Sequence, residues 1–454
     1  MTTRPRVAIV GGGISGLAAA LDLAEHAEVE VFEAKARLGG PVQTVDFAGS
    51  RVEAGPDSFL ARRPEMINLA TRLGLGDALI APSAGDAGIW SRGAVRTMPK
   101  GLVLGVPREL KGLARSGIVS RAGIARAQLD RVLPTTRVDD DIAMGELVRK
   151  RFGREVQERL VDPLMGGVHA GRSDLLSTAV ASPQLLAAAR KGGSLMKALP
   201  ETPPSTDPVF LTVASGLGDV IDAASARLRD AGVAIRLSSP VTGLRVTGVG
   251  WEVNGEAFDG VVLATHAPVT ARLLEGISGD AASALSTVTY SSVVLTLLAY
   301  PSSALREPFR LSGYLVPRPE RKLTSAISWW TTKWATRAPS DTHIARASTG
   351  RIDDLRHHDL SDDELVARLH AELVDAIGLR AEAPTAARVN RYEDALPQFR
   401  AGHLTKVAAR AHTAAANIQA PLALAGSAYE GLGLPACVAS GQAAAAAMRA
   451  RLTR

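Results

Sequence analysis

A glycine-rich turn near the start of the chain, set between an apolar strand and an alanine-rich helix, constrains the fold most strongly. Residues 6–10 form a short apolar run typical of a buried parallel strand, and residues 17–23 favour a helix. A second apolar run at 29–32 ends at Glu33. The turn itself consists of Gly11, Gly12, Gly13, Ile14, Ser15 and Gly16. Strand, turn, helix and strand within about 30 residues predict a dinucleotide-binding α/β unit.

Individual positions of this unit have physical tasks. Gly11 allows a tight turn, Gly13 lets the backbone approach a pyrophosphate, and Gly16 lets the helix pack closely on the strand. The helix N-terminus offers free N–H groups to phosphates, and the Glu33 carboxylate can accept hydrogen bonds from a ribose. The glycines alone are also consistent with a plain turn, but their ordered context favours a nucleotide site.

The residues after Glu33 distinguish FAD from NAD. Ala34 follows directly, and Arg37, Gly39 and Gly40 come shortly after it. An arginine and two glycines, which have no side chain, suit a second segment of the chain that runs along an extended dinucleotide. The pattern resembles the second motif of FAD-dependent amine oxidases, phytoene desaturases and porphyrinogen oxidases. We therefore expect FAD, bound non-covalently.

Three later stretches can also approach a flavin. Val241 stands where flavoproteins of this type contact the adenine through their backbone. Near the C-terminus, a strand at 422–427 leads into a glycine-rich turn and a helix from about Ser440, whose N-terminus can stabilise negative charge on a reduced flavin. Cys437 is a candidate covalent anchor, but a small buried thiol is the better interpretation. The other cofactor candidates are Gly55, Pro56, Asp57, Ser58, Gly426, Leu432, Gly433 and Leu434.

The cysteine and histidine content excludes several redox chemistries. A single cysteine in 454 residues excludes a disulfide framework, a cysteine-ligated iron–sulfur cluster and a CxxC redox pair. The nine histidines show no metal-ligand spacing, so we expect no metal. A second GxGxxG turn, the mark of a pyridine-nucleotide site, is also missing from the sequence. Dioxygen is therefore the expected acceptor of electrons from the reduced flavin.

The charge pattern limits the expected partners. The chain carries 52 Lys and Arg against 46 Asp and Glu, a formal net charge of +6, mixed along most of its length. We expect no nucleic-acid partner. Residues 92–131 are more basic, which fits a solvated helical face, a wall for an anionic ligand, or peripheral contact with anionic lipid. No apolar run approaches the ~20 residues of a membrane-spanning helix, and the N-terminus lacks a signal-peptide core, so we expect a cytoplasmic protein.

The chain as a whole resembles the bacterial oxygen-dependent coproporphyrinogen III and protoporphyrinogen oxidases, within the amine-oxidase-like FAD flavoprotein superfamily. Besides the motifs above, the resemblance rests on GPDSFL at 55–60, DPLMGGVHAG at 162–171, KW at 333–334, PQF with GH at 397–403, and GLGLP at 431–435. It implies an α/β fold with a Rossmann-like FAD-binding domain of the glutathione-reductase/p-hydroxybenzoate-hydroxylase type, a mixed α+β substrate domain and a helical subdomain. The expected parts are an FAD-binding domain at 1–75, 205–275 and 405–454, a substrate-binding domain at 76–90 and 276–404, and a helical subdomain at 91–204.

The resemblance also implies a reaction. An FAD-dependent oxidase of this kind converts coproporphyrinogen III to coproporphyrin III in haem biosynthesis, in three two-electron steps that reduce O2 to H2O2. Asp57 stands where the eukaryotic branch tends to carry arginine, which favours this activity over the nearest alternative, a protoporphyrinogen IX oxidase. More distant alternatives are an amine or carotenoid oxidoreductase and a non-enzymatic flavin-binding scaffold. The implied partners are a porphyrinogen, O2, and ferrochelatase as a product acceptor.

A tetracarboxylate substrate requires cationic groups at the rim of its site. The candidates for substrate contact are Arg62, Arg63, Lys100, His169 and Lys333. His169 stands where relatives often have tyrosine, and Pro41 where many have a basic residue, so the family assigns neither a role. No catalytic dyad is recognisable in the sequence, which fits a reaction carried by the cofactor.

Overall fold

A parallel β-sheet of five strands organises the nucleotide-binding part of the protein, which a computed structural model describes for residues 4–200 and 207–453. The strands follow the order β12-β2-β1-β16-β22, and every neighbouring pair is parallel. Their bounds are β1 (Arg6–Val10), β2 (Glu28–Phe32), β12 (Ala234–Arg236), β16 (Gly260–Leu263) and β22 (Leu422–Leu424). Three distant parts of the chain therefore build one sheet.

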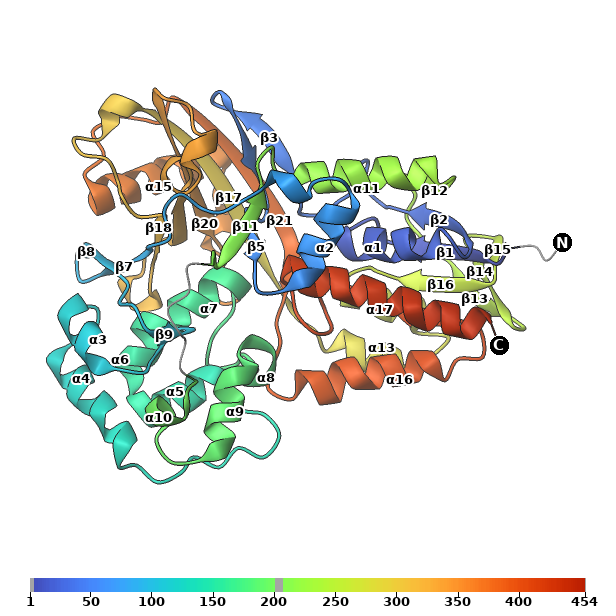
Figure 1. Ribbon diagram of the computed structural model, residues 1–454, viewed down its shortest axis with the longest axis horizontal. Helices are drawn as coiled ribbons and strands as arrows, with labels where there is room; N and C mark the ends of the chain where they lie inside the picture. Colours follow the sequence, from blue (N-terminus) through green and yellow to red (C-terminus); the bar gives the residue numbers. More distant parts are fainter. Residues whose placement is uncertain (1–3, 201–206, 454) are drawn as a thin grey trace.

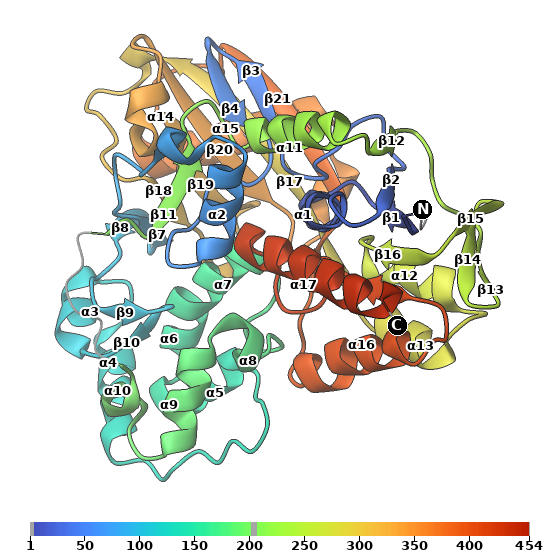
Figure 2. The same ribbon diagram turned by 45° about the vertical axis from the view of Figure 1, so that its right-hand side comes forward.

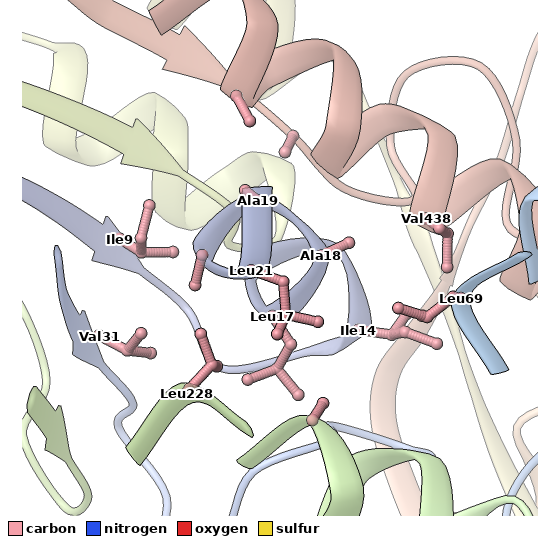
Figure 3. Packing of buried hydrophobic residues seen from close by; sticks show 14 of the residues in the cluster. Ile9, Ile14, Leu17, Ala18, Ala19, Leu21, Val31, Leu69, Leu228 and Val438 are labelled. Carbon is pink, nitrogen blue, oxygen red and sulfur yellow. The ribbon is translucent and has the colours of Figure 1, made fainter. Parts of the chain in front are cut away.

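Different elements cover the two faces of this sheet, because side chains alternate along each strand. Val7 and Ile9 belong to the core of the first face, and Figure 3 shows Ile9 and Leu17 in this core. The helices of that face are α1 (Ile14–Leu23), α2 (Pro64–Arg72), α11 (Gly218–Asp230) and α17 (Leu434–Leu452). Ala8 and Val10 belong to the core of the second face. That face is covered by α12 (Ala267–Leu274), α13 (Gly279–Ser286), α16 (Ala409–Ala416) and an antiparallel sheet of β13 (Leu244–Thr247), β14 (Gly250–Val253) and β15 (Glu256–Phe258).

A second, mixed sheet of seven strands lies beside the nucleotide-binding part (Figure 1). Its order is β21-β17-β20-β19-β18-β7-β8, and β18 pairs with β7 in parallel. The bounds are β7 (Gly88–Ser91), β8 (Ala94–Thr97), β17 (Tyr290–Pro301), β18 (Gly313–Leu315), β19 (Thr324–Trp329), β20 (Thr342–Thr349) and β21 (Ala386–Pro397). The helix α15 (Asp362–Ile377) packs Leu365, Leu369 and Leu373 into the core beside this sheet. These leucines recur every four residues, as one buried helix stripe requires.

Short helices between β10 and β11 form a separate helical layer, which lies below the seven-stranded sheet in Figures 1 and 2. They are α3 (Leu110–Ser116), α4 (Arg121–Gln128), α5 (Met144–Phe152), α6 (Arg154–Val156), α7 (Asp162–His169), α8 (Thr178–Ala181), α9 (Pro183–Lys191) and α10 (Leu195–Ala198). Their shared core includes Leu147, Phe152 and Leu185, all fully buried. This core is separate from the cores of the two sheets.

Short strands and one helix connect these parts. β11 pairs with both β5 and β6, so the chain returning from the helical layer is fixed to the segment after β4. The connecting elements are β3 (Thr44–Phe47), β4 (Ser50–Glu53), β5 (Phe59–Leu60), β6 (Leu79–Ile80), β9 (Leu102–Val103), β10 (Val106–Pro107), β11 (Phe210–Val213) and α14 (Trp330–Lys333).

The structure has the Rossmann-like α/β fold that the first turn predicts, and it corrects one element. The C-terminal helix α17 begins at Leu434 rather than near Ser440, because Pro435 is well tolerated in a first helical turn. The strand β8 lies beyond residue 91, where the helical subdomain is expected to start, and the expected boundary at 204–205 lies outside the described residues. None of the described helices combines the length and apolar character needed to cross a bilayer.

Candidate cofactor and substrate site

The first glycine turn joins β1 to α1, and nearby backbone atoms leave almost no space for a side chain at Gly11 and Gly16. Gly11 has a φ of +110°, a conformation that favours glycine. A Cβ atom at Gly16 would lie 1.9 Å from the carbonyl oxygen of Gly11, so only glycine lets α1 come this close. At Gly13, by contrast, no described atom outside the neighbouring residues lies within 4 Å of such a Cβ. The backbone at Gly13 therefore borders open space that suits a phosphate.

The N-terminus of α1 and the end of β2 meet at this turn. Gly13 is the N-cap of α1, and no described side chain caps that helix end. The Glu33 carboxylate accepts hydrogen bonds from the backbone N–H groups of Gly12 and Lys35, each at 2.8 Å. Uncapped N–H groups attract phosphate, and an acid at this strand end suits a ribose. The residues present therefore fit a dinucleotide cofactor.

The second glycine loop lies directly against the first. The backbone N–H of Gly39 donates to the carbonyl oxygen of Gly12 at 2.8 Å, and a Cβ at Gly40 would lie 3.9 Å from the Cα of Gly13. Arg37 follows Ala34 and Lys35 into this loop, and its guanidinium donates to the carbonyl oxygens of Leu38, Gly40 and Val42. Arg37 thus fixes the shape of the loop from within.

A third loop, Gly55-Pro56-Asp57-Ser58, continues this arrangement after β4. A Cβ at Gly55 would lie 1.8 Å from the carbonyl oxygen of Pro41, so the third loop packs on the second with no room for a side chain. The Ser58 hydroxyl donates to Asp57 Oδ1 at 2.9 Å. The first turn and the two later loops therefore lie next to one another.

Asp57 connects this loop to the seven-stranded sheet. Lys333 Nζ, at the end of α14, lies 3.0 and 2.9 Å from its two carboxylate oxygens, and Arg346 on β20 lies 2.8 Å from Oδ2. Burial by itself raises the pKa of the Asp57 carboxyl, but the two cations outweigh it and hold that pKa far below its usual value. Asp57 is therefore a carboxylate at every physiological pH.

The C-terminal loop reaches the same region through α17. Gly426 has a φ of +133°, and its N–H donates to Ser440 Oγ at 3.1 Å. Gly433, between Leu432 and Leu434, is the N-cap of α17, again without a described side-chain cap. About two turns further along α17, a Cβ at Gly441 would lie 2.1 Å from the carbonyl oxygen of Ser15, so α17 and α1 are in backbone contact.

Cys437, near the start of α17, is a buried free thiol. Burial raises the pKa of this thiol to about 12, so it stays protonated at neutral pH. A thiol in this state is a poor nucleophile, which agrees with the expected non-covalent cofactor.

The candidates for substrate contact divide into buried and exposed groups. His169 ends α7, is 7% exposed, and lies edge-on to Phe399 with ring centroids 5.9 Å apart. Burial lowers the pKa of His169 to about 4, and its Nδ1 has no hydrogen-bond partner among the described residues. Lys333 is joined to Asp57, as described above. Arg62, Arg63 and Lys100 are exposed, and Arg63 pairs with Glu65 instead. Val241 is half-buried at the edge of the second-face core.

The sequence motifs did not identify Arg346. It lies in the middle of β20, is 7% exposed, and donates to the Gly55 carbonyl oxygen as well as to Asp57. The sequence signal is only local, since Arg346 stands between Ala345 and Ala347 in the buried middle of a strand. A buried charge in a central strand needs a partner, yet the sequence alone does not say which one.

Comparison with known proteins agrees with this geometry. Residues 14–449 match the family model described as flavin containing amine oxidoreductase. Coproporphyrinogen III oxidase of Bacillus subtilis (strain 168) is 30% identical, and that of Mycobacterium tuberculosis (strain ATCC 25618 / H37Rv) is 34% identical, each with 97% of both chains covered. A crystal structure of a protein provisionally named protoporphyrinogen oxidase, from Exiguobacterium sp. 255-15, has a TM-score of 0.89 at 28% identity and covers 100% of both chains.

These similarities confirm the resemblance predicted from the sequence motifs and the prediction that the cofactor is FAD. The chain belongs to the flavin-containing amine oxidoreductase family, in which its curated relatives of similar length carry the name coproporphyrinogen III oxidase.

Proposed function

We propose that the protein is an FAD-dependent oxidase that converts coproporphyrinogen III to coproporphyrin III, with O2 reduced to H2O2. The observation that carries this proposal is similarity along nearly the whole chain to relatives with that name. The conversion removes six hydrogens in three two-electron steps, so three O2 molecules become three H2O2 molecules. Bound FAD would supply the two-electron acceptor for each step.

We assign the cofactor to the three loops and the two helix ends described above. Gly13 and the free N–H groups at the start of α1 would hold the pyrophosphate, and Glu33 would hold a ribose. Val241 would contact the adenine. The start of α17 would lie near the flavin, where its partial positive charge favours negative charge. The full set is Gly11, Gly12, Gly13, Ile14, Ser15, Gly16, Glu33, Ala34, Arg37, Gly39, Gly40, Gly55, Pro56, Asp57, Ser58, Val241, Gly426, Leu432, Gly433 and Leu434.

Protein groups have a limited task in this chemistry, because the pyrrole N–H protons of the substrate become acidic as it is oxidised. His169 is neutral at physiological pH and can accept a hydrogen bond at Nδ1, for which the described part of the chain offers no partner. We propose that this imidazole receives a pyrrole N–H of the bound macrocycle. The exposed Arg62, Arg63 and Lys100 remain candidates for the outer rim of the site.

We also propose a domain role for each part of the chain. Residues 1–75, 205–275 and 405–454 would form an FAD-binding domain of the glutathione-reductase/p-hydroxybenzoate-hydroxylase type. Residues 76–90 and 276–404 would form the substrate-binding domain, and 91–204 a helical subdomain that covers it. The enzyme would act in the cytoplasm, touch membranes only peripherally, and pass its product to ferrochelatase.

Aerobic incubation of the purified protein with each porphyrinogen tests the activity. We expect porphyrin fluorescence and H2O2 to appear in a ratio of three H2O2 per porphyrin, faster with coproporphyrinogen III. A faster rate with protoporphyrinogen IX would identify that activity instead. Anaerobic addition of coproporphyrinogen should bleach the flavin absorbance; an unbleached flavin would indicate a scaffold rather than an oxidase.

A further inference from the structure

The cluster formed by Asp57, Lys333 and Arg346 contains two cations and one carboxylate. Two buried carboxylates elsewhere each pair with one cation. Glu53 pairs with Arg337 at 3.0 Å, and Asp130 pairs with Arg151 at 2.6 Å. The Asp57 carboxylate, by contrast, pairs with two cations, Lys333 and Arg346. Among the described residues no second carboxylate pairs with either cation, so the cluster has one surplus positive charge.

This surplus lies in a poorly hydrated place. The side chains of Asp57, Lys333 and Arg346 are 12%, 16% and 7% exposed. The Nε of Arg346 is buried and has no hydrogen-bond partner among the described residues. One carboxylate balances only one of the two positive charges, and an uncompensated buried charge is costly, so the cluster is short of one anion.

Lys333 is the member of the cluster that can reach a ligand. Two of its ammonium contacts go to Asp57, and an ammonium has three N–H donors. Its Nζ lies 5.9 Å from the ring centroid of Phe210, which is 40% exposed, and 5.3 Å from that of the buried Trp334. An exposed aromatic ring beside a cation suits a ligand that is flat and apolar but carries an acid.

We propose that Lys333 binds a carboxylate of the tetrapyrrole substrate, that Asp57 and Arg346 position its ammonium, and that Phe210 contacts the macrocycle. The inference rests on the proposed function and names the group that recognises the substrate. The carboxylate of the ligand supplies the anion that the cluster lacks. Asp57 is then a counter-ion that keeps Lys333 in place between turnovers, rather than a flavin ligand alone.

Binding of the stable product tests this without turnover. We expect the FAD-loaded protein to bind coproporphyrin III at least roughly tenfold more tightly than its tetramethyl ester, which keeps the ring but has no charge. In Lys333→Met, affinity for the tetra-acid should fall roughly tenfold while affinity for the ester stays the same. Porphyrin fluorescence quenching measures both affinities.

Lys322→Met is the matched control. Lys322 also pairs with one carboxylate, Asp375, and lies 5.4 Å from an aromatic ring centroid, that of Trp90, but it is not part of the cluster. The Lys322→Met variant should bind both porphyrins with the same affinity as the wild type. Lys333→Arg should restore most of the tetra-acid affinity, because it restores the charge.

Steady-state kinetics supplies a second readout. Lys333→Met should raise KM for coproporphyrinogen with little change in kcat, and its flavin content should equal that of the wild type. If Lys333→Met loses its flavin, two other measurements still test the inference. These are the ratio of the wild-type affinities for coproporphyrin III and its tetramethyl ester, and the affinity of Lys333→Arg for the tetra-acid.

Equal affinity of the wild type for acid and ester, or unchanged tetra-acid affinity in flavin-loaded Lys333→Met, would overturn the inference. Wild-type protein that oxidises neither porphyrinogen would instead overturn the proposed function. The two failures are distinguishable because the binding assay needs no turnover.

Discussion

At the scale of single residues, the glycines of the first turn have different reasons to be glycine. Gly16 has no room for a Cβ, because the Gly11 carbonyl oxygen would lie 1.9 Å away. Gly13 has room, since no described atom beyond its neighbours lies within 4 Å of that position. Gly16 is therefore required for the packing of the fold, whereas Gly13 is required for the binding of the ligand.

Alanine substitutions should separate these two requirements. Gly16→Ala should lower the free energy of unfolding by about 1–3 kcal/mol, the usual cost of overpacking, even without FAD. Gly13→Ala should leave the apoprotein about as stable as the wild type, but weaken FAD binding, because the added methyl fills the space of the phosphate. Denaturant unfolding and FAD titration measure the two effects. Gly279→Ala, at another helix start with open space, is the control. Equal stability loss in both turn variants would contradict the assignment.

His169 gives a pH prediction at the same scale. Its folded-state pKa of about 4 lies below the ~6.5 of an unfolded histidine. Between these values the unfolded chain binds a proton that the folded protein rejects, so this residue reduces stability as the pH falls from about 6.5 to about 4.

At pH 5 this cost should be about 2 kcal/mol relative to pH 7.5. His169→Tyr should therefore lose less stability between these two pH values than the wild type, by about that amount. Denaturant unfolding at both pH values measures the difference, and a variant at the exposed His26 serves as control. Identical pH slopes for His169→Tyr and the wild type would show that the imidazole is not buried in solution.

The sequence identifies single candidate residues, but it does not show which of them pair with one another. Asp57 and Lys333 were both candidates, yet nothing in the sequence joins two residues that are 276 positions apart. Arg346 carried no motif at all. Local patterns identify residues that need a partner, whereas the fold decides which partner they meet.

At the scale of elements, one buried ion pair holds the helical layer together. Asp130 accepts hydrogen bonds from Arg151 at 2.6 Å, from the Ser194 hydroxyl, and from the backbone N–H groups of Leu195 and Met196. It thereby ties α5 to the start of α10. The helices of this layer are too short to be stable alone, so such contacts define their arrangement.

Asp130→Ala should destabilise this layer strongly, because it leaves the Arg151 guanidinium buried without its anion. The expected cost is about 3–5 kcal/mol. Hydrogen exchange of the amides of α5 and α10 should report faster opening, with little change in α1 or α17. Glu146→Ala removes an exposed partner of Lys150 on the same helix and should cost less than about 1 kcal/mol. Similar exchange in both variants would argue against a structural role for the pair.

Elements with one simple pattern were predictable, and elements defined by tertiary contacts were not. The apolar runs of β1, β2 and β22 and the helix α11 follow from strand and helix preferences. The early start of α17 does not follow from the sequence, because the glycine-rich segment just before Leu434 looks like a longer loop, although Pro435 fits a helix start. The π-helical turns at Gln157–Val161 and Leu404–Ala408 have no sequence signal of their own.

At the scale of the whole molecule, FAD should act as a structural component as well as a reagent. The proposed site draws on the first turn, the loops up to Ser58, and the start of α17, which come from opposite ends of the chain. A ligand that bridges them stabilises only the folded state.

Removing FAD should therefore lower Tm, and adding it back should restore Tm. At a free FAD concentration of 100 times Kd, the gain in the free energy of unfolding should be about 2.7 kcal/mol. Thermal unfolding of apoprotein and reconstituted protein, monitored by circular dichroism, measures the change. NAD at the same concentration is the control ligand and should not shift Tm. A Tm that is indifferent to FAD would mean that the site does not bridge these segments.

The edge strand β22 is among the last segments of the chain, and it completes a sheet whose first strand begins at Arg6. During synthesis the N-terminal half-site leaves the ribosome long before its closing strand and α17 exist, although domains otherwise tend to fold as they emerge. We therefore expect the cofactor to be captured only after β22 and α17 have been made. A polypeptide that stops before β22 would keep the first glycine turn but lack the start of α17, which we assign to the flavin, so it should bind the cofactor poorly.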